Sequence, residues 1–264
     1  MSEQVNIPST MLMFEEEVVE RRLAFKPDPE LNNLCMGVIN EIRIDTRVTP
    51  TINEDGTDNT WEYAGLEVPT LVIEFKQCKT AENPKDRYYT FTSKPVTTMT
   101  KDGMAVDPAT VTNIVMQEYA KLRHIANQFK GLKEYPANTK CPGIDIAAPA
   151  KTRIEQYKAF YEYFVDLFTG TGATPMYKAH RFWMKLVANY KTGKYLEFPQ
   201  FVGRGFIERV IEKQNPTLEF EANETVVLNK DSKAGAREKA AGAPAPMGSE
   251  SVSEDVKSIL EKYA

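Results

Sequence analysis

The stretch 178–208 contains the clearest β-hairpin signal in the chain, and the rest of the fold has to be organised around it. Apolar and polar side chains alternate with period two from Phe182 to Tyr190, which is the spacing of a strand. Gly193 follows in the turn, where it is free to take a positive φ angle. A second strand returns over 194–201, and Pro199 marks its end or an edge position because it has no N–H to donate.

The composition of this region indicates a function for the hairpin. Residues 178–213 hold eight Lys and Arg against three Glu, with seven aromatic residues among them. A single strand of nucleic acid suits such a surface, because cations pair with phosphates and rings stack on bases of any sequence. Alternation places Trp183 and Lys185 on one face, as this function requires. The alternative is that the aromatic rings form the core and the lysine stems cover apolar surface.

Charge is distributed unevenly along the 264 residues. Residues 1–62 carry a net charge of −8, residues 63–213 carry +7 and residues 214–264 carry −3. Acidic termini on either side of a basic middle segment suit a nucleic-acid-binding protein in which the termini compete with the nucleic acid for the binding groove. They equally suit a virion protein that packs acidic arms on its neighbours. The pattern therefore leaves a binding function and a structural function open.

The sequence offers no recognisable catalytic or metal-binding chemistry. Cys35, Cys78 and Cys141 lack metal-ligand spacing, and their odd number argues against a disulfide framework. Phosphate-binding Gly-Lys-Ser/Thr loops and nucleophile elbows are absent from the sequence. A secretory leader and an apolar run long enough for a membrane span are also absent. We therefore expect a cytoplasmic protein that is not an enzyme and has no metal, cofactor or membrane contact.

Three strands are expected before the helical part of the chain, over 34–47, 66–76 and 88–94. Gly37 is expected to mark a bulge or a bend in the first of them. The apolar face predicted for that first strand consists of Leu34, Met36, Val38, Ile42 and Ile44.

Two helices are expected next, within an insertion of about 107–170. Asp107 and Pro108 read as an N-cap followed by proline at the first helical position, and Gly131 ends this helix. Pro149 opens the second helix, which runs to Phe168. His124, on the first helix, is expected to be a solvated residue.

The two ends of the chain read differently from its middle. Residues 1–30 form either a helix or an extended arm, and the core covers 31–228. Residues 206–213 form a short helix or a strand, and 218–228 form a last strand or a short pair. Residues 229–264 read as a flexible tail that ends in a short amphipathic helix. Its apolar side would dock on a partner or remain a frayed terminus, and it carries Val256, Ile259, Leu260 and Tyr263.

The order of these elements resembles that of bacteriophage-type single-stranded DNA-binding proteins with an OB-fold. The resemblance is carried by KDRYYTFTSK (85–94), HRFWMKLVANYKTGKYLEF (180–198) and the tail from 229. It implies an α+β protein, with an OB-fold-like antiparallel β-barrel, a two-helix insertion and a flexible C-terminal tail. It also implies sequence-tolerant binding of single-stranded DNA in phage replication or recombination, in the host cytoplasm. Replication or recombination proteins would then contact the tail.

Ten residues are the candidates for the nucleic-acid site. The predicted phosphate contacts are Lys85, Arg87, Arg181, Lys185, Lys191 and Lys194. The predicted stacking residues are Tyr88, Tyr89, Trp183 and Tyr195. Trp61 and Tyr63 either anchor the loop before the second strand or stack a further base. The alternative function is that of a virion structural or assembly protein whose termini make the subunit contacts.

Overall fold

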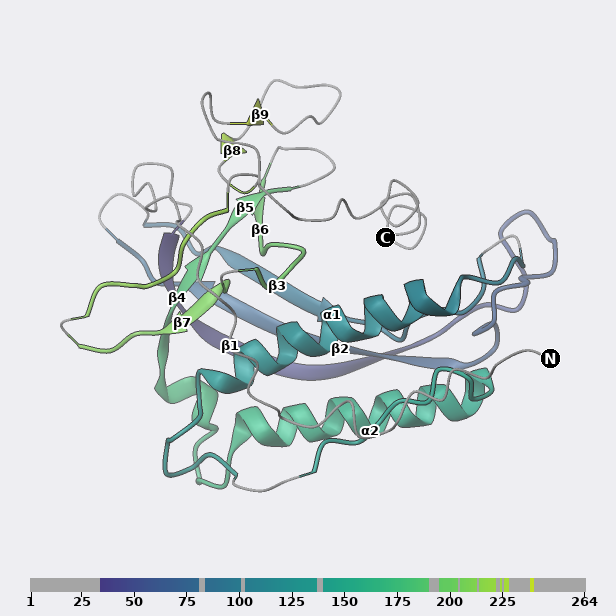
Figure 1. Ribbon diagram of the computed structural model, residues 1–264, viewed down its shortest axis with the longest axis horizontal. Helices are drawn as coiled ribbons and strands as arrows, with labels where there is room; N and C mark the ends of the chain where they lie inside the picture. The colour runs from purple at the N-terminus through teal and green to yellow at the C-terminus, as the bar shows by residue number, and fades with distance from the viewer. Residues whose placement is uncertain are drawn as a thin grey trace.

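The chain folds into one five-stranded antiparallel sheet with two long helices beside it (Figure 1). This computed structural model describes residues 34–80, 84–100, 103–136, 140–189, 195–203, 205–212, 214–221, 224, 226–227 and 238–239. The α+β class predicted from the sequence is confirmed. Among the described residues the sheet is open and does not close into a barrel. The helix or arm predicted for 1–30 and the C-terminal helix lie outside these residues.

The main sheet has the strand order β3-β2-β1-β4-β7. Its strands are β1 (Leu34–Val48), β2 (Glu67–Gln77), β3 (Tyr88–Ser93), β4 (Arg181–Lys185) and β7 (Ile207–Arg209). The helices are α1 (Pro108–Asn127), α2 (Ala150–Thr169) and the 3-10 helix η3 (Met176–Ala179). Two small pairs complete the structure, β5 (Val187–Ala188) with β6 (Leu196–Glu197) and β8 (Val226–Val227) with β9 (Glu238–Lys239). Of the predicted tail 229–264, only the backbone of β9 is described.

The predicted hairpin is confirmed, but it is divided between two sheets. β4 joins the main sheet, and the chain then leaves it at Leu186. β5 and β6 form the antiparallel hairpin itself, in which Val187 pairs with Glu197. Phe198 directly follows β6 and lies in the core, where its ring contacts Phe75 edge to face.

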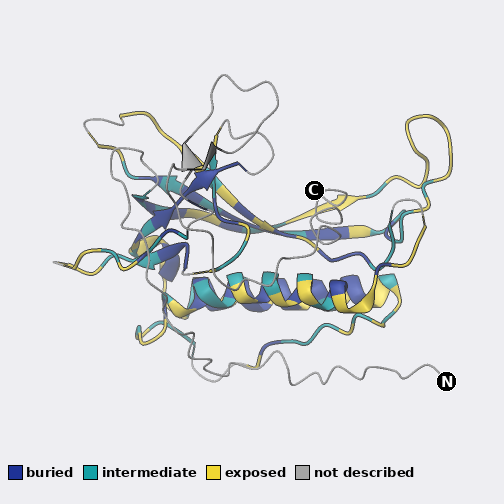
Figure 2. Cartoon of the chain, turned by 45° about the horizontal axis from the view of Figure 1, so that its top comes forward, coloured by how far each residue is buried: buried dark blue, intermediate teal, exposed yellow. Residues whose placement is uncertain are grey.

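α2 begins and ends where the sequence predicts, whereas α1 begins at the predicted residue but ends at Asn127, before the predicted stop at Gly131. Asp107 caps α1 by accepting a hydrogen bond of 2.9 Å from the backbone N–H of Thr110, and Pro108 follows it. α2 ends at Gly170, whose φ of 75° is the left-handed conformation that glycine tolerates best. The apolar stripes of both helices pack on one face of the sheet, and most exposed residues lie in the loops beyond (Figure 2).

A β-bulge in β1 decides which of its side chains reach the core. The pairing with β2 shifts between Ile39 and Glu41, so an extra residue, Asn40, reverses the alternation. Ile39 and Ile42 consequently both face the helices. The predicted apolar face is therefore wrong in its first half, because Leu34, Met36 and Val38 lie on the opposite face and are only half-buried.

Gly37 serves a different purpose from the predicted bulge. A Cβ atom built there would lie 2.5 Å from the Met184 side chain and 2.8 Å from the carbonyl oxygen of Lys76. Because no side chain fits between these two neighbouring strands, the residue has to be glycine.

α1 takes the place of a further strand along the edge of β7. The Nε2 atom of His124 lies 2.9 Å from the carbonyl oxygen of Ile207, and the side chain of Gln128 accepts a hydrogen bond of 2.9 Å from the N–H of Arg209. One turn of helix thus satisfies backbone groups that an edge strand would otherwise present to water. The same His124 ring packs against Phe206, so the expectation of a solvated histidine is wrong.

We expect acid to destabilise the fold through His124. Desolvation lowers the pKa of this imidazole from 6.5 to about 4, so the folded protein binds its proton less well than the unfolded chain does. Stability is then fully present above pH 6.5 and is lost as the pH falls from 6.5 towards 4, by up to about 2 kcal/mol at pH 5. Urea unfolding of the wild type at pH 7 and pH 5 measures this loss.

The His124→Gln variant is the matched control, because glutamine keeps a hydrogen-bonding group at this position but does not titrate. Its stability should fall less between pH 7 and pH 5 than that of the wild type. The remaining loss belongs to groups such as His180, whose pKa desolvation also lowers. Equal losses in both proteins would contradict the assignment.

Candidate nucleic-acid interface

The face of the sheet that points away from the helices brings aromatic and basic residues together across four strands. The pairing register aligns Tyr88 of β3 with Lys76 of β2, Lys76 with Val38 of β1, and Val38 with Arg181 of β4. In the neighbouring row Met36 pairs with Trp183. Directly paired residues share a face of a sheet. These side chains form what we call the four-strand patch: Met36, Val38, Lys76, Tyr88, Arg181 and Trp183.

Tyr88 and Lys76 form the outer end of the four-strand patch. Tyr88 is 49% exposed, which leaves much of its ring free for a stacking partner. The Nζ atom of Lys76 lies 5.5 Å from the centre of that ring, within the range of a cation–π contact. A ring and a cation are thus presented side by side to solvent.

Arg181 and Trp183 form the other end of the patch, two residues apart on β4. Arg181 is exposed, whereas Trp183 is half-buried. The indole Nε1 is buried and has no hydrogen-bond partner among the described residues. Trp183 is therefore anchored in the protein along one edge, and only part of its ring is available to a ligand.

Tyr89 and Arg87 lie on the opposite face from Tyr88, because strand neighbours alternate. Tyr89 is half-buried, its ring contacts Phe198, and its hydroxyl donates a hydrogen bond of 3.3 Å to the side chain of Gln77. Burial raises the pKa of this hydroxyl, and the nearby guanidinium of Arg87 partly offsets that effect. Of the two tyrosines predicted to stack bases, only Tyr88 therefore belongs to the four-strand patch.

Lys185 is the clearest correction to the predicted site. Its side chain is completely buried, and its Nζ atom lies 2.6 Å from the carboxylate of Glu224 and 3.1 Å from the carbonyl oxygen of Glu219. The ring of Phe220 covers the same ammonium group. The expectation that Lys185 faces solvent beside Trp183 is wrong, and we remove it from the candidate phosphate contacts.

The remaining predicted residues are dispersed or lie outside the described part of the chain. Lys85 is exposed in the connection between β2 and β3, and Tyr195, at 56% exposure, lies just before β6. The predicted residues outside the described part are Lys191, Lys194, Val256, Ile259, Leu260 and Tyr263.

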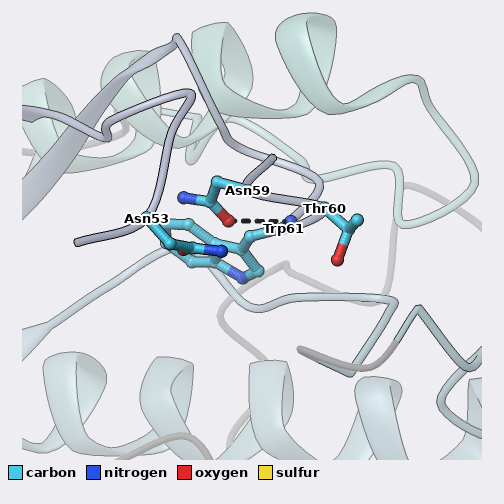
Figure 3. A pocket seen from close by; sticks show the side chains of 4 residues that line it. All are labelled: Asn53, Asn59, Thr60 and Trp61. Carbon is cyan, nitrogen blue, oxygen red and sulfur yellow. Dashed lines mark hydrogen bonds between the residues drawn. The ribbon is translucent and has the colours of Figure 1, made fainter. Parts of the chain in front are cut away.

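The tip of the β1–β2 hairpin contains a small cavity of about 330 Å³ (Figure 3). The residues that line it are Asn53, Asn59, Thr60 and Trp61. The two asparagines are held by the loop itself, since Asn59 accepts a hydrogen bond from the N–H of Trp61 and Asn53 donates to Thr57. The cavity is therefore lined by groups that hold the hairpin tip together.

Tyr63 connects the hairpin tip to α2. Its side chain is fully buried, and its hydroxyl donates to the carbonyl of Val96 and accepts a hydrogen bond of 3.0 Å from Arg153. Arg153 in turn pairs with the carboxylate of Glu62. Tyr63 thus anchors the loop, while the half-buried Trp61 packs edge to face on it at 5.2 Å.

The described part of the chain offers no metal site and no membrane-spanning helix, and two of its thiols are buried. No group of three His, Cys, Asp or Glu side chains there comes together to hold a metal ion. Burial raises the pKa of the Cys35 and Cys141 thiols to about 12, so both remain protonated at neutral pH. No described helix has the length and apolar character needed to cross a membrane.

Lys76, Val38 and Met36 are the members of the patch that the sequence prediction missed. Lys76 is the last residue of the predicted strand 66–76, so the sequence indicated its position on that strand. Nothing in the sequence indicates that it pairs with Tyr88. Met36 and Val38 belong to the face that the bulge in β1 reverses.

Comparison of the chain with protein-family models, with curated proteins and with solved structures finds no match.

We expect Lys185 and Glu224 to be a structural pair. Replacing Lys185 with methionine leaves the buried Glu224 carboxylate without its counter-ion and should lower the free energy of unfolding by roughly 3 kcal/mol. Adding Glu224→Leu removes the stranded charge and should restore at least half of the loss. Urea unfolding at pH 7 measures both effects. A single variant as stable as the wild type, or a double variant less stable than the single one, would show that the pair has no such role.

Proposed function

We propose that this protein binds single-stranded DNA through the four-strand patch, without sequence preference, and acts in DNA replication or recombination. The observation that carries the proposal is the cross-strand row that runs over four strands from Tyr88 through Lys76 and Val38 to Arg181. A ring that stacks on a base and cations that pair with the adjoining phosphates are the two components of sequence-tolerant binding.

The size of the patch suits a few nucleotides of an extended strand. Its row crosses four adjacent strands, a distance of about 14 Å at the usual strand spacing. Half-buried Val38 lies between the two cations, and half-buried Met36, beside Trp183 in the next row, extends this apolar floor. Base faces that are splayed out of a duplex can lie on such a floor, whereas the stacked bases of a duplex cannot reach it. The proposal therefore includes a preference for single strands.

The order of the strands supports the same proposal. Three consecutive antiparallel strands, two helices and then two further strands in the order β3-β2-β1-β4-β7 are compatible with a partly open OB-fold barrel. OB-folds bind oligonucleotides over their second and third strands. Lys76 lies on β2 and Tyr88 on β3. We extend the proposal to an OB-like barrel, and to a C-terminal tail that docks replication or recombination proteins.

Titration with an oligo-dT strand tests the proposed function directly. The chain has two tryptophans, and a Trp61→Phe variant leaves Trp183 as the fluorophore within the patch. We expect the oligonucleotide to quench the fluorescence of Trp183, and the logarithm of the affinity to fall linearly with that of the salt concentration. The slope should be about −0.7 for each phosphate contact.

A duplex of the same length is the control ligand, and it should bind more weakly at every salt concentration. Absence of oligo-dT binding at low salt would discard the proposal. Stoichiometric self-assembly without nucleic acid would then favour the alternative of a virion structural or assembly protein.

The neighbouring tyrosines of β3 provide a matched pair of variants. Tyr88→Ala removes an exposed stacking ring and should weaken oligo-dT binding roughly tenfold while leaving the free energy of unfolding nearly unchanged. Tyr89→Ala removes a ring that packs on Phe198 and should cost roughly 2 kcal/mol of stability. Fluorescence titration and urea unfolding of both variants measure the two effects. The reverse result, with Tyr89 controlling affinity, would place the DNA on the other face of the sheet.

A further inference from the structure

Asp86, in the connection between β2 and β3, bridges two lysines at the edge of the four-strand patch. Its Oδ1 atom lies 3.0 Å from the Nζ of Lys76, and its Oδ2 atom lies 3.2 Å from the Nζ of Lys79. The two ammonium groups thus meet at one carboxylate, each bound to a different oxygen. Lys76 is at the same time the cation beside the Tyr88 ring.

These ion pairs are exposed and therefore weak. The side chains of Lys76, Asp86 and Lys79 are 34%, 41% and 55% exposed. Ion pairs at such exposure contribute little to stability, because water and salt screen them. The hydrogen bond from Lys76, followed by that from Lys79, lowers the pKa of the Asp86 carboxyl, so it is ionised at neutral pH. The carboxylate can consequently be exchanged for another anion at low cost.

A backbone phosphate has the chemistry to make that exchange. It presents two anionic oxygens on one atom, as Asp86 presents two on its carboxylate carbon, and it can pair with both ammonium groups. A base attached to the same strand would lie within reach of the Tyr88 ring. We propose that Asp86 occupies a phosphate site made by Lys76 and Lys79, and that single-stranded DNA displaces its carboxylate from both lysines.

This inference rests on the proposed function and adds a phosphate site and its internal competitor to it. Lys79 becomes a DNA contact, although it lies outside the cross-strand row. Asp86 becomes a residue that weakens binding, because each binding event has to break its two ion pairs. The affinity of the wild type is then lower than the lysines alone would allow.

The test compares Asp86→Asn with Asp45→Asn in oligo-dT titrations at low and moderate salt. Asp45 is a matched control, since it is 53% exposed and its carboxylate also pairs with a cation, Arg43, at 2.9 Å. It lies opposite Thr70 of β2, six residues along the strand from Lys76, which places it about 20 Å away. That distance exceeds the screening length of about 10 Å at 0.1 M salt.

We expect Asp86→Asn to bind oligo-dT roughly threefold to tenfold more tightly than the wild type, and Asp45→Asn to differ from it by less than twofold. In a Lys76→Gln, Lys79→Gln background, which should itself bind more weakly, Asp86→Asn should have little further effect. Urea unfolding of each variant checks that the fold is retained.

Other results would overturn the inference and leave the proposed function in place. Equal tightening by Asp86→Asn and Asp45→Asn would reduce the effect to overall charge. Unchanged or weaker binding by Asp86→Asn, while the wild type binds, would show that the carboxylate does not compete with phosphate. Failure of the wild type itself to bind oligo-dT would instead remove both the proposed function and the phosphate site.

Discussion

The bulge at Asn40 is the constraint on which both faces of the sheet depend. β1 pairs with β4 over Leu34–Val38 and with β2 over Gly37–Val48, and the bulge lies just after the segment that pairs with both. The extra residue allows Ile39 and Ile42 to face the helices together, and it turns Met36 and Val38 outward. In a regular strand, residues at odd and even positions face opposite sides of the sheet. Ile39 and Ile42 could then not both face the helices. The core and the apolar floor of the patch therefore have one common origin.

The second constraint is the open edge of the sheet at β7. A three-residue strand has few ladder hydrogen bonds of its own, and its outer edge would expose unpaired backbone groups. α1 supplies His124 and Gln128, one turn apart, to bond to those groups. Both residues lie at the C-terminal end of the helix, where Gln128 is the C-cap, and they are on the same side because they are four positions apart. The end of one helix thus completes the edge of the sheet.

The helices and strands could be predicted from residues that are close in the sequence. The site could not, because it depends on contacts between residues that are far apart in the sequence. The N-cap of α1 and both ends of α2 depend on residues a few positions apart, which a sequence displays directly. The burial of Lys185 depends on Glu224, 39 residues away, and no spacing rule connects the two. Tyr88 and Tyr89 are the same type of residue and have the same β-strand propensity. Only the pairing register with β2 therefore shows which of them faces solvent.

The middle of the chain presents less free positive charge on the patch than its count of Lys and Arg suggests. The sequence places a surplus of positive charge there, yet one of the central lysines is neutralised inside the protein and two others share the Asp86 carboxylate. Arg181 stays exposed on the patch. A patch with so little free charge attracts a polyanion weakly over long range. If it binds single strands, the affinity has to come in large part from stacking on Tyr88 and Trp183, which is a short-range interaction that duplex DNA cannot make. The modest charge of the patch is therefore a reason to expect discrimination between single and double strands.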